Sequence, residues 1–503
     1  MKVKTTLILM IVFAALLAFI FLSDIREKGK PETADKLVDL SSEDIEKIIF
    51  KTEEETITFT KENEGDWLIT DPLEAKADKY EVDRIAGDFA ALDIDRVVEE
   101  EPADLEKYGI PQKEISLFFK DKEAPVKILI GMENPLDKKF FAKRADETKV
   151  VLIGTQFKSL LDKKIFDFRE KKIFQFETDE VKRIVLRSGD IQWEAAMDGE
   201  DWMLTEPVKS LAEQSQITTL LTSLSDLKAV EFVSEAKKDE ETAEYALDKP
   251  EHEVVLELPL ENQKVTFFIS KNDDKVYATT SLSSKIVEVE DSITENLSKE
   301  PGELRDKGIA DFYSWEAKKV QVEKGDMTVA AVKDEDGNWH FDKEDGEEAD
   351  KEKIESLVRT IENLQAEGFI DPPLKLADYG LDNPLAKITI SVKDGEDKTK
   401  DTTIIIGKTI LEKVAKAEEE KGESKAGTAA EAGSTEKAEA KKEEEKSAET
   451  AEEEDKIEEK EWVVIKNARF DYLFKAPTEF LTEIPQTIDD WKPPAPEPES
   501  EEE

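Results

Sequence analysis

The stretch GDWLITDP, residues 65–72, decides the fold because it is the first copy of a pattern that returns twice. The later copies read EDWMLTEP at residues 200–207 and GNWHFDKE at residues 337–344. Their tryptophans lie 135 and then 137 residues apart, and a fixed period of this kind indicates an internal repeat. The repeated tryptophans are Trp67, Trp202 and Trp339.

A stripe of apolar residues at helical spacing follows each tryptophan. In the first copy the spacing is i, i+3, i+7 and i+10, and the other two copies keep the same spacing in register. This period is typical of an amphipathic helix that buries one face. The stripes are Val82, Ile85, Phe89 and Leu92, then Ile217, Leu220, Leu224 and Leu227, then Ile354, Leu357, Ile361 and Leu364.

A tyrosine phrase follows each stripe, in the forms EKYGIPQ, AEYALDKP and DYGLDNP. Each phrase precedes an alternating run that is typical of a strand, namely EISLFF, EVVLEL and KITISV. Glycine permits unusual backbone dihedrals and proline cannot donate to a ladder, so we interpret the phrase as a structural turn. A ligand-binding loop is the alternative. The tyrosines are Tyr108, Tyr245 and Tyr379.

These patterns predict an α+β fold. One N-terminal transmembrane helix would precede three tandem repeats, each made of antiparallel strands and one long amphipathic helix. A segment at 411–460 is almost entirely Ala, Glu, Lys, Ser, Thr and Gly, so we expect it to be a disordered acidic insert. The expected boundaries are a cytoplasmic tail at 1–4, an anchor at 5–22, a linker at 23–37, copy one at 38–173, copy two at 174–310, copy three at 311–491 and a disordered acidic tail at 492–503.

Residues 5–22 carry no charge. As a helix, these residues would span about 27 Å, which is enough to cross the hydrocarbon core of a membrane. A cleavable signal peptide is the alternative, but no small-x-small cleavage site precedes the charged residues that follow. We therefore expect a single-pass membrane protein whose bulk lies outside the cytoplasm.

The formal net charge is -49, and the chain has no cysteine. A surface of this charge repels phosphate backbones, so we expect no nucleic-acid partner. The lack of cysteine excludes disulfides, thiolate nucleophiles and Cys-ligated zinc.

A second repeated phrase contains an arginine, as DFREKKI and as ELRDKGI. Arg169 and Arg305 are 136 residues apart, and each precedes the first strand of the next copy. We interpret them as braces between copies. Binding of a partner's carboxylate is the alternative.

Catalytic chemistry has little support in the sequence. The two histidines, His252 and His340, occupy positions that the copies do not share. The phrase KDEDGNW from Lys333 resembles a calcium loop but lacks the Gly and Glu that an EF-hand requires. We therefore predict no catalytic, cofactor-binding or metal-binding residue and no cofactor, and we interpret the repeated tryptophans as core residues; a platform for sugar stacking is the alternative.

The whole pattern resembles the bacterial domain-of-unknown-function family 4340, over about Val38 to Trp491. Copy three keeps YGLDNP but lacks the proline after its tryptophan, and copy two has Ala246 in place of glycine. The resemblance implies an envelope protein of the bacterial inner membrane, associated with ABC transport systems of the gliding-motility type.

The expected function is that of a non-enzymatic accessory or interaction protein in such a transport complex. An envelope module that binds glycan or peptidoglycan, or acts as a spacer, is the alternative. A hydrolase that works through carboxylates is the third and least favoured hypothesis.

Overall fold

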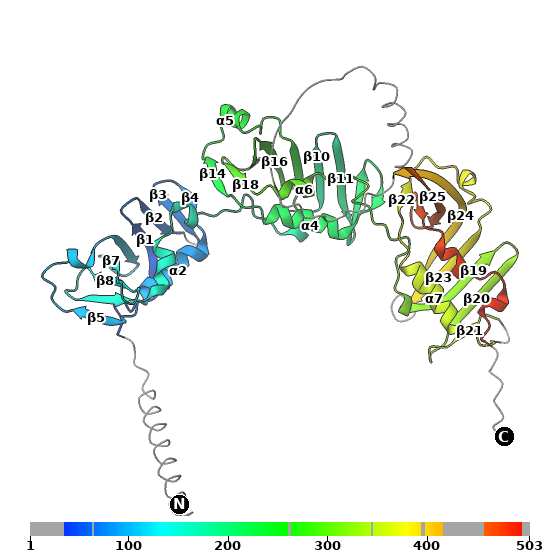
Figure 1. The fold of residues 1–503 in the computed structure, drawn as a ribbon, viewed down its shortest axis with the longest axis horizontal. Helices are drawn as coiled ribbons and strands as arrows, with labels where there is room; N and C mark the ends of the chain where they lie inside the picture. Colours follow the sequence, from blue (N-terminus) through cyan, green and yellow to red (C-terminus); the bar gives the residue numbers. More distant parts are fainter. Residues whose placement is uncertain are drawn as a thin grey trace, which may run out of the picture. The chain divides into compact units, whose positions relative to one another are not determined.

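The structure of the chain is a computed structural model that describes residues 35–62, 65–259, 263–343, 346–393, 398–415 and 457–494. These residues form three antiparallel sheets, one in each copy (Figure 1). The expected anchor at 5–22 lies outside the described residues. Among the helices that are described, none has the length and apolar character needed to cross a membrane.

Copy one contains nine strands in the order β4-β3-β2-β1-β6-β7-β8-β9-β5. Its elements are β1 (Ile45–Lys51), β2 (Thr56–Lys61), β3 (Trp67–Asp71), β4 (Ala75–Lys76), α2 (Lys79–Ala90), β5 (Arg96–Glu99), β6 (Lys113–Phe119), β7 (Val126–Glu133), β8 (Phe140–Arg144), β9 (Val150–Ile153) and α3 (Lys158–Leu161).

Copy two repeats this order as β13-β12-β11-β10-β15-β16-β17-β18-β14. Its elements are β10 (Arg183–Ser188), β11 (Ile191–Asp198), β12 (Asp201–Glu206), β13 (Ser210–Leu211), α4 (Gln214–Ser225), β14 (Glu231–Ser234), α5 (Asp239–Glu244), β15 (His252–Glu257), β16 (Lys264–Asn272), β17 (Lys275–Thr280), β18 (Ile286–Val289) and α6 (Ile293–Leu297).

Copy three has eight strands in the order β21-β20-β19-β23-β24-β25-β26-β22. Its elements are β19 (Ala317–Lys324), β20 (Met327–Lys333), β21 (Trp339–Phe341), α7 (Lys351–Glu362), β22 (Gly368–Ile370), β23 (Ala386–Lys393), β24 (Thr399–Ala415), β25 (Ile457–Asn467) and β26 (Leu473–Ala476).

The predicted α+β class is wrong. The fold is mostly antiparallel sheet, with few helices, and it does not place a long amphipathic helix in each copy. The strands before and after each tryptophan join into one sheet. The joining pair is β1 with β6 in copy one, and Phe50 faces Ile115 across it. The same pairing joins β10 to β15 and β19 to β23.

Each copy has one helix of twelve residues on the predicted stripe. The helices begin behind carboxylate N-caps at Asp78, Glu213 and Asp350. The fourth stripe residue lies beyond each helix, and its carbonyl accepts a backbone hydrogen bond from a distant segment. The carbonyl of Leu92 accepts from Leu37, that of Leu227 from Ile173 and that of Leu364 from Ile309.

The stripe residues are buried in the cores between helix and sheet. In copy one, Val82, Ile85, Phe89 and Leu92 are all 0% exposed and share a cluster with Trp67. In copy three, Ile354, Leu357, Ile361 and Leu364 share a cluster with Trp339. Burial of this face accounts for the helical stripe.

The described chain divides into two compact units. The first contains the described residues up to Phe174, together with Leu227–Glu235 and Lys285–Glu290. The second contains Gln175–Asp226, Ala236–Ser284 and the described residues from Asp291 onward.

Some expected boundaries need correction. Leu37, which was assigned to the linker, is 1% exposed in the core of copy one. The predicted insert begins too early and ends too late, because 411–415 belong to β24 and 457–460 belong to β25. The rest of the insert lies outside the described residues, as do residues 495–503 of the tail.

Candidate functional site

Trp67 is the first residue of β3, Trp202 the second residue of β12 and Trp339 the first residue of β21. All three are buried in the core. They are 1%, 7% and 1% exposed in chain order. Nε1 of Trp67 donates to Asp83 on α2 at 2.7 Å, and Nε1 of Trp339 donates to Glu355 on α7 at 3.5 Å. Because the rings are buried, they offer no open face on which a sugar could stack.

In copies one and three, the tyrosine turn packs against the face of the sheet opposite to the helix. Gly109 and Gly380 have φ values of 64° and 70°, and Ala246 adopts the same left-handed conformation with φ 56°. The hydroxyl of Tyr108 donates to Glu99 at 2.6 Å, and burial is the main cause that raises the pKa of this tyrosine. Tyr108 belongs to a small apolar cluster of its own.

The tyrosine turns also approach a neighbouring strand closely, β7 in copy one and β24 in copy three. A Cβ on Gly131 of β7 would lie 2.2 Å from the carbonyl oxygen of Tyr108, and one on Gly407 of β24 would lie 2.3 Å from that of Tyr379. In copy two the corresponding residue is Ser270, whose hydroxyl donates to the carbonyl of Ala246 at 2.9 Å.

Arg169 is 4% exposed and contacts the β14 edge of copy two. Its guanidinium donates to both carboxylate oxygens of Glu235, at 2.5 and 2.9 Å. The guanidinium carbon also lies 3.4 Å from the ring centroid of Phe232, which adds a cation–π contact. Burial, followed by the nearby charge of Arg169, lowers the pKa of Lys285. Carboxylate, guanidinium and ring together form a joint between segments of the first compact unit.

Arg305 repeats this arrangement within the second compact unit. It is also 4% exposed, and its Nη1 donates to Asp371 at 2.9 Å. Its guanidinium lies over Phe369 at 3.7 Å and over Tyr472 at 4.6 Å, while Nε donates to Ser210 at 3.0 Å. Both arginines are thus occupied by groups of this chain.

The family to which the chain belongs follows from three overlapping matches to the family model described as Domain of unknown function (DUF4340). The matches cover residues 67–242, 202–384 and 339–413, and each begins at one of the repeated tryptophans. The chain belongs to the DUF4340 family. No curated protein matches the chain.

This DUF4340 protein also has a weak match among solved structures. The crystal structure of the DNA polymerase III subunit beta from Pseudomonas aeruginosa is 9% identical, with 72% of this chain and 88% of that chain covered. The TM-score is 0.14, so the match carries no argument about the fold.

Sequence reasoning missed the acceptors that the DUF4340 arginines use. Glu235 and Asp371 each lie 66 residues after their arginine, and that equal spacing was the available signal. The missed carboxylates stand at the ends of short edge strands, which the hydropathy pattern did not mark. Copy three ends with Lys492 at the corresponding position, and this lysine pairs with Asp489 at 2.7 Å.

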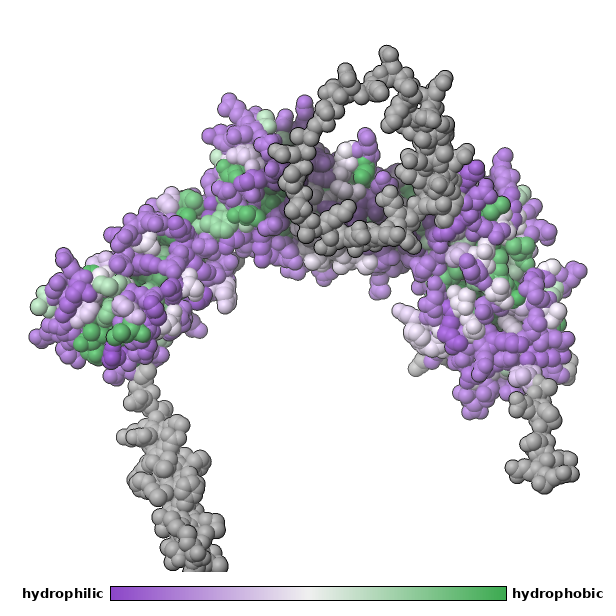
Figure 2. Space-filling model, viewed as in Figure 1, coloured by the Kyte–Doolittle hydropathy of each residue, from purple (hydrophilic) through white to green (hydrophobic). Residues whose placement is uncertain are grey.

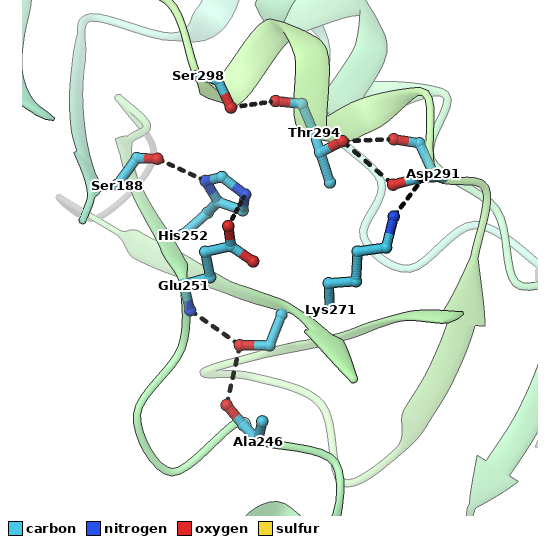
Figure 3. A network of polar contacts seen from close by, with 9 residues as sticks. Ser188, Ala246, Glu251, His252, Lys271, Asp291, Thr294 and Ser298 are labelled. Atoms are coloured by element: carbon cyan, nitrogen blue, oxygen red, sulfur yellow. Dashed lines mark hydrogen bonds and ion pairs between the residues drawn. The ribbon is translucent and has the colours of Figure 1, made fainter. Parts of the chain in front are cut away.

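The two histidines of this DUF4340 chain occupy unrelated settings. His252 is 2% exposed, and its Nδ1 lies 2.7 Å from the hydroxyl of Ser188 on the neighbouring strand (Figure 3). Its Nε2 has no hydrogen-bond partner among the described residues and lies 3.9 Å from Glu251. Burial lowers the pKa of His252. The Ser–His contact is a buried pair across two neighbouring strands.

The calcium-like loop is held by its own hydrogen bonds. Asp334 accepts from the backbone N–H of Asn338 at 2.8 Å and contacts Nε2 of His340 at 2.8 Å. The hydrogen bond from Asn338, followed by that from His340, lowers the pKa of Asp334. Among the residues that the structure describes, no three His, Asp or Glu side chains are grouped so that they could hold a metal ion.

A cavity of about 320 Å³ lies in copy one between the β1–β2 turn and the segment after α3. Two of its lining lysines are paired with lining carboxylates. Lys113 pairs with Asp162 at 3.0 Å, and Lys164 pairs with Glu54 at 3.0 Å. The cavity therefore offers no unpaired cation to an anionic ligand through these two lysines.

Proposed function

We propose that the protein is a non-enzymatic, membrane-anchored accessory or interaction subunit of an ABC-type envelope transport system, with its bulk outside the cytoplasm. The observation that carries the proposal is the use of the repeated residues. Tryptophans, tyrosine turns and arginines all contact groups of this chain. The repeat would thereby supply surface for partners in place of a reaction centre. The envelope setting is what the resemblance noted from the sequence implies, together with the uncharged segment at 5–22.

The surface also fits this proposal. In the view of Figure 2, the described residues are mostly hydrophilic, with separate apolar patches. A strongly acidic chain of this kind resists nonspecific association and presents small patches to specific partners.

Affinity purification of the full chain from native membranes tests the proposal. We expect ATP-binding and permease subunits of a transport system to be recovered with it. Recovery of the chain without any transport component, under conditions that preserve a known membrane complex in the same preparation, would contradict the proposal.

One observation favours the second candidate, a glycan-binding module. Tyr313 and Trp315 stack at 4.4 Å with an interplanar angle of 16°, and they are 57% and 67% exposed. Trp315 is the central residue of a short helical turn, Ser314–Glu316, and the matching turns of the other copies carry Glu43 and Asp179. The fold therefore does not require an aromatic ring there.

Binding of the full chain to peptidoglycan fragments tests this candidate. Trp315→Ala should abolish binding, because it removes the larger exposed ring. Tyr80→Ala, which removes an exposed ring of copy one, is the matched control. Absence of binding by the unmodified chain would dispose of the candidate.

A further inference from the structure

Each joint has a donor half and an acceptor half. The donors are Arg169 and Arg305. Four residues after them, the N–H groups of Ile173 and Ile309 donate to the carbonyl of the stripe residue just past the helix. The acceptor is a phenylalanine on the edge strand followed by a carboxylate. In copy two the acceptor consists of Phe232 and Glu235.

Copy one has the acceptor half as well. Strand β5 pairs with β9 as β14 pairs with β18, with Val97 opposite Val151 as Phe232 is opposite Val287. Both pairings then shift register by one residue, so Glu100 corresponds to Glu235. Copy one thus keeps the carboxylate but has an aliphatic floor in place of the ring.

Glu100 is exposed, and no hydrogen bond or ion pair of the described residues involves it. Its neighbour Glu99 is already taken by Lys107 at 2.5 Å and by Tyr108 at 2.6 Å. The acceptor carboxylate of copy one is therefore open, whereas those of copies two and three are paired.

The sequence has no cation at the donor position of copy one. The N–H of Leu37 binds the carbonyl of Leu92, as Ile173 binds Leu227. The residue four positions before Leu37 is Thr33, which carries no charge. The sequence position that corresponds to the two donors therefore supplies no cation to this acceptor.

We propose that Val97 and Glu100 form a docking surface for an arginine-bearing segment of a partner protein. The inference rests on the proposed function and names the surface that a transport subunit would contact. Arginine suits this surface because its planar guanidinium can bind a carboxylate with two parallel hydrogen bonds. Arg169 binds Glu235 in this way, and Arg305 lies over the ring of Phe369.

The apolar floor of this docking surface, Val97, can exclude water from one side of the contact. Val97 is partly buried against the core cluster of copy one that contains Trp67. Figure 2 shows hydrophobic residues gathered at the end of copy one where β5, β7 and β8 lie. A guanidinium–carboxylate pair gains strength where neighbouring groups keep water away.

A double-mutant cycle in the full chain tests whether the acceptor takes an arginine. Thr33→Arg places an arginine at the sequence position that corresponds to the donors, and it should raise the unfolding midpoint of copy one by about 3 °C. Glu100→Gln should remove this gain, whereas Glu101→Gln, at a neighbouring exposed carboxylate, should keep it. A gain that survives Glu100→Gln, or no gain at all, would overturn the acceptor assignment.

The amount of transport subunits recovered in affinity purification of the full chain tests whether the partner docks at Val97 and Glu100. Glu100→Lys and Thr33→Arg should each lower recovery about tenfold, since one repels the partner's arginine and the other occupies its place. Glu101→Lys should leave recovery unchanged, and Val97→Phe should increase it. Recovery that is insensitive to Glu100→Lys would overturn this inference alone, whereas recovery of no transport subunit by the unmodified chain would overturn the proposed function too.

Discussion

The carbonyl oxygens of Tyr108 and Tyr379 occupy space that a side chain on the neighbouring strand would fill. Copies one and three make room for the carbonyl oxygen by having glycine there, Gly131 and Gly407. In copy two the hydroxyl of Ser270 stands at this position and donates to the carbonyl of Ala246. The repeated tyrosine phrase could be predicted as a turn from its glycine and proline. The glycine or serine that contacts the turn on the neighbouring strand could not be predicted, because that contact joins residues more than twenty positions apart.

Substitution of Gly131 by alanine should destabilise copy one by about 1 to 3 kcal/mol, because the new Cβ would overlap the Tyr108 carbonyl. Gly87→Ala on α2 is the matched control. No atom lies within 4 Å of its added Cβ, and alanine is the better helix former, so it should stabilise by up to about 1 kcal/mol. Urea denaturation of both variants measures the difference, and equal effects would contradict the close approach.

His252 gives copy two a pH dependence of defined sign. Burial lowers its pKa in the folded chain, and the charge of Glu251 opposes this only in part. The unfolded chain, with a histidine pKa of about 6.5, therefore binds the proton more readily. Stability should fall as pH drops below about 6.5.

We expect the urea midpoint of copy two to be lower at pH 5.5 than at pH 7.5, and His252→Gln to reduce this difference. His340 has the opposite sign, because the hydrogen bond to Asp334 raises its pKa. Its contribution is present below about pH 6.5 and is lost as the pH rises through the raised value. An acid loss that His252→Gln leaves unchanged would contradict the assignment.

At the scale of elements, the apolar stripe located each helix but not its length. Val82, Ile85 and Phe89 lie on α2, whereas Leu92 lies past its end. Hydrophobic spacing marks which residues are buried, and a residue in the turn after a helix can be buried as deeply as one on the helix. Past the helix, the carbonyl of Leu92 accepts a hydrogen bond from Leu37, a distant contact that the spacing along the helix does not contain.

The stripe makes a direct stability prediction for α4. Leu224 is 0% exposed, so Leu224→Ala should cost about 2 to 5 kcal/mol through lost burial and a cavity. Thr218→Ala, at an exposed position of the same helix, should change stability by less than about 0.5 kcal/mol. Thermal unfolding followed by circular dichroism measures both changes, and similar midpoints would contradict the burial.

At the scale of the whole molecule, the period of about 136 residues predicted the repetition but not the fold class. Strands precede and follow each tryptophan along the chain, and in copy one the pairing of β1 with β6 joins them into one wide sheet. That pairing joins residues more than sixty positions apart, and no local pattern contains it. A single helix of twelve residues cannot form a layer equal to nine strands, so the fold is mostly β.

The arginines were predicted as braces, and the alternative was a partner's carboxylate. The structure places carboxylates of the chain itself, Glu235 and Asp371, on Arg169 and Arg305. The central claim is therefore that these arginines hold segments of this chain together. Removal of a buried charge partner costs far more than loss of an exposed ion pair.

The most direct test is a double-mutant cycle on Arg169→Met and Glu235→Gln, with the free energy of unfolding measured in urea. The exposed pair of Arg187 and Glu253, 2.7 Å apart, is the matched control, because its arginine side chain is 50% exposed against 5% for Arg169. A coupling of at least about 1.5 kcal/mol is expected for Arg169 and Glu235, and below about 0.5 kcal/mol for the control. Additive effects at Arg169 and Glu235 would contradict the joint.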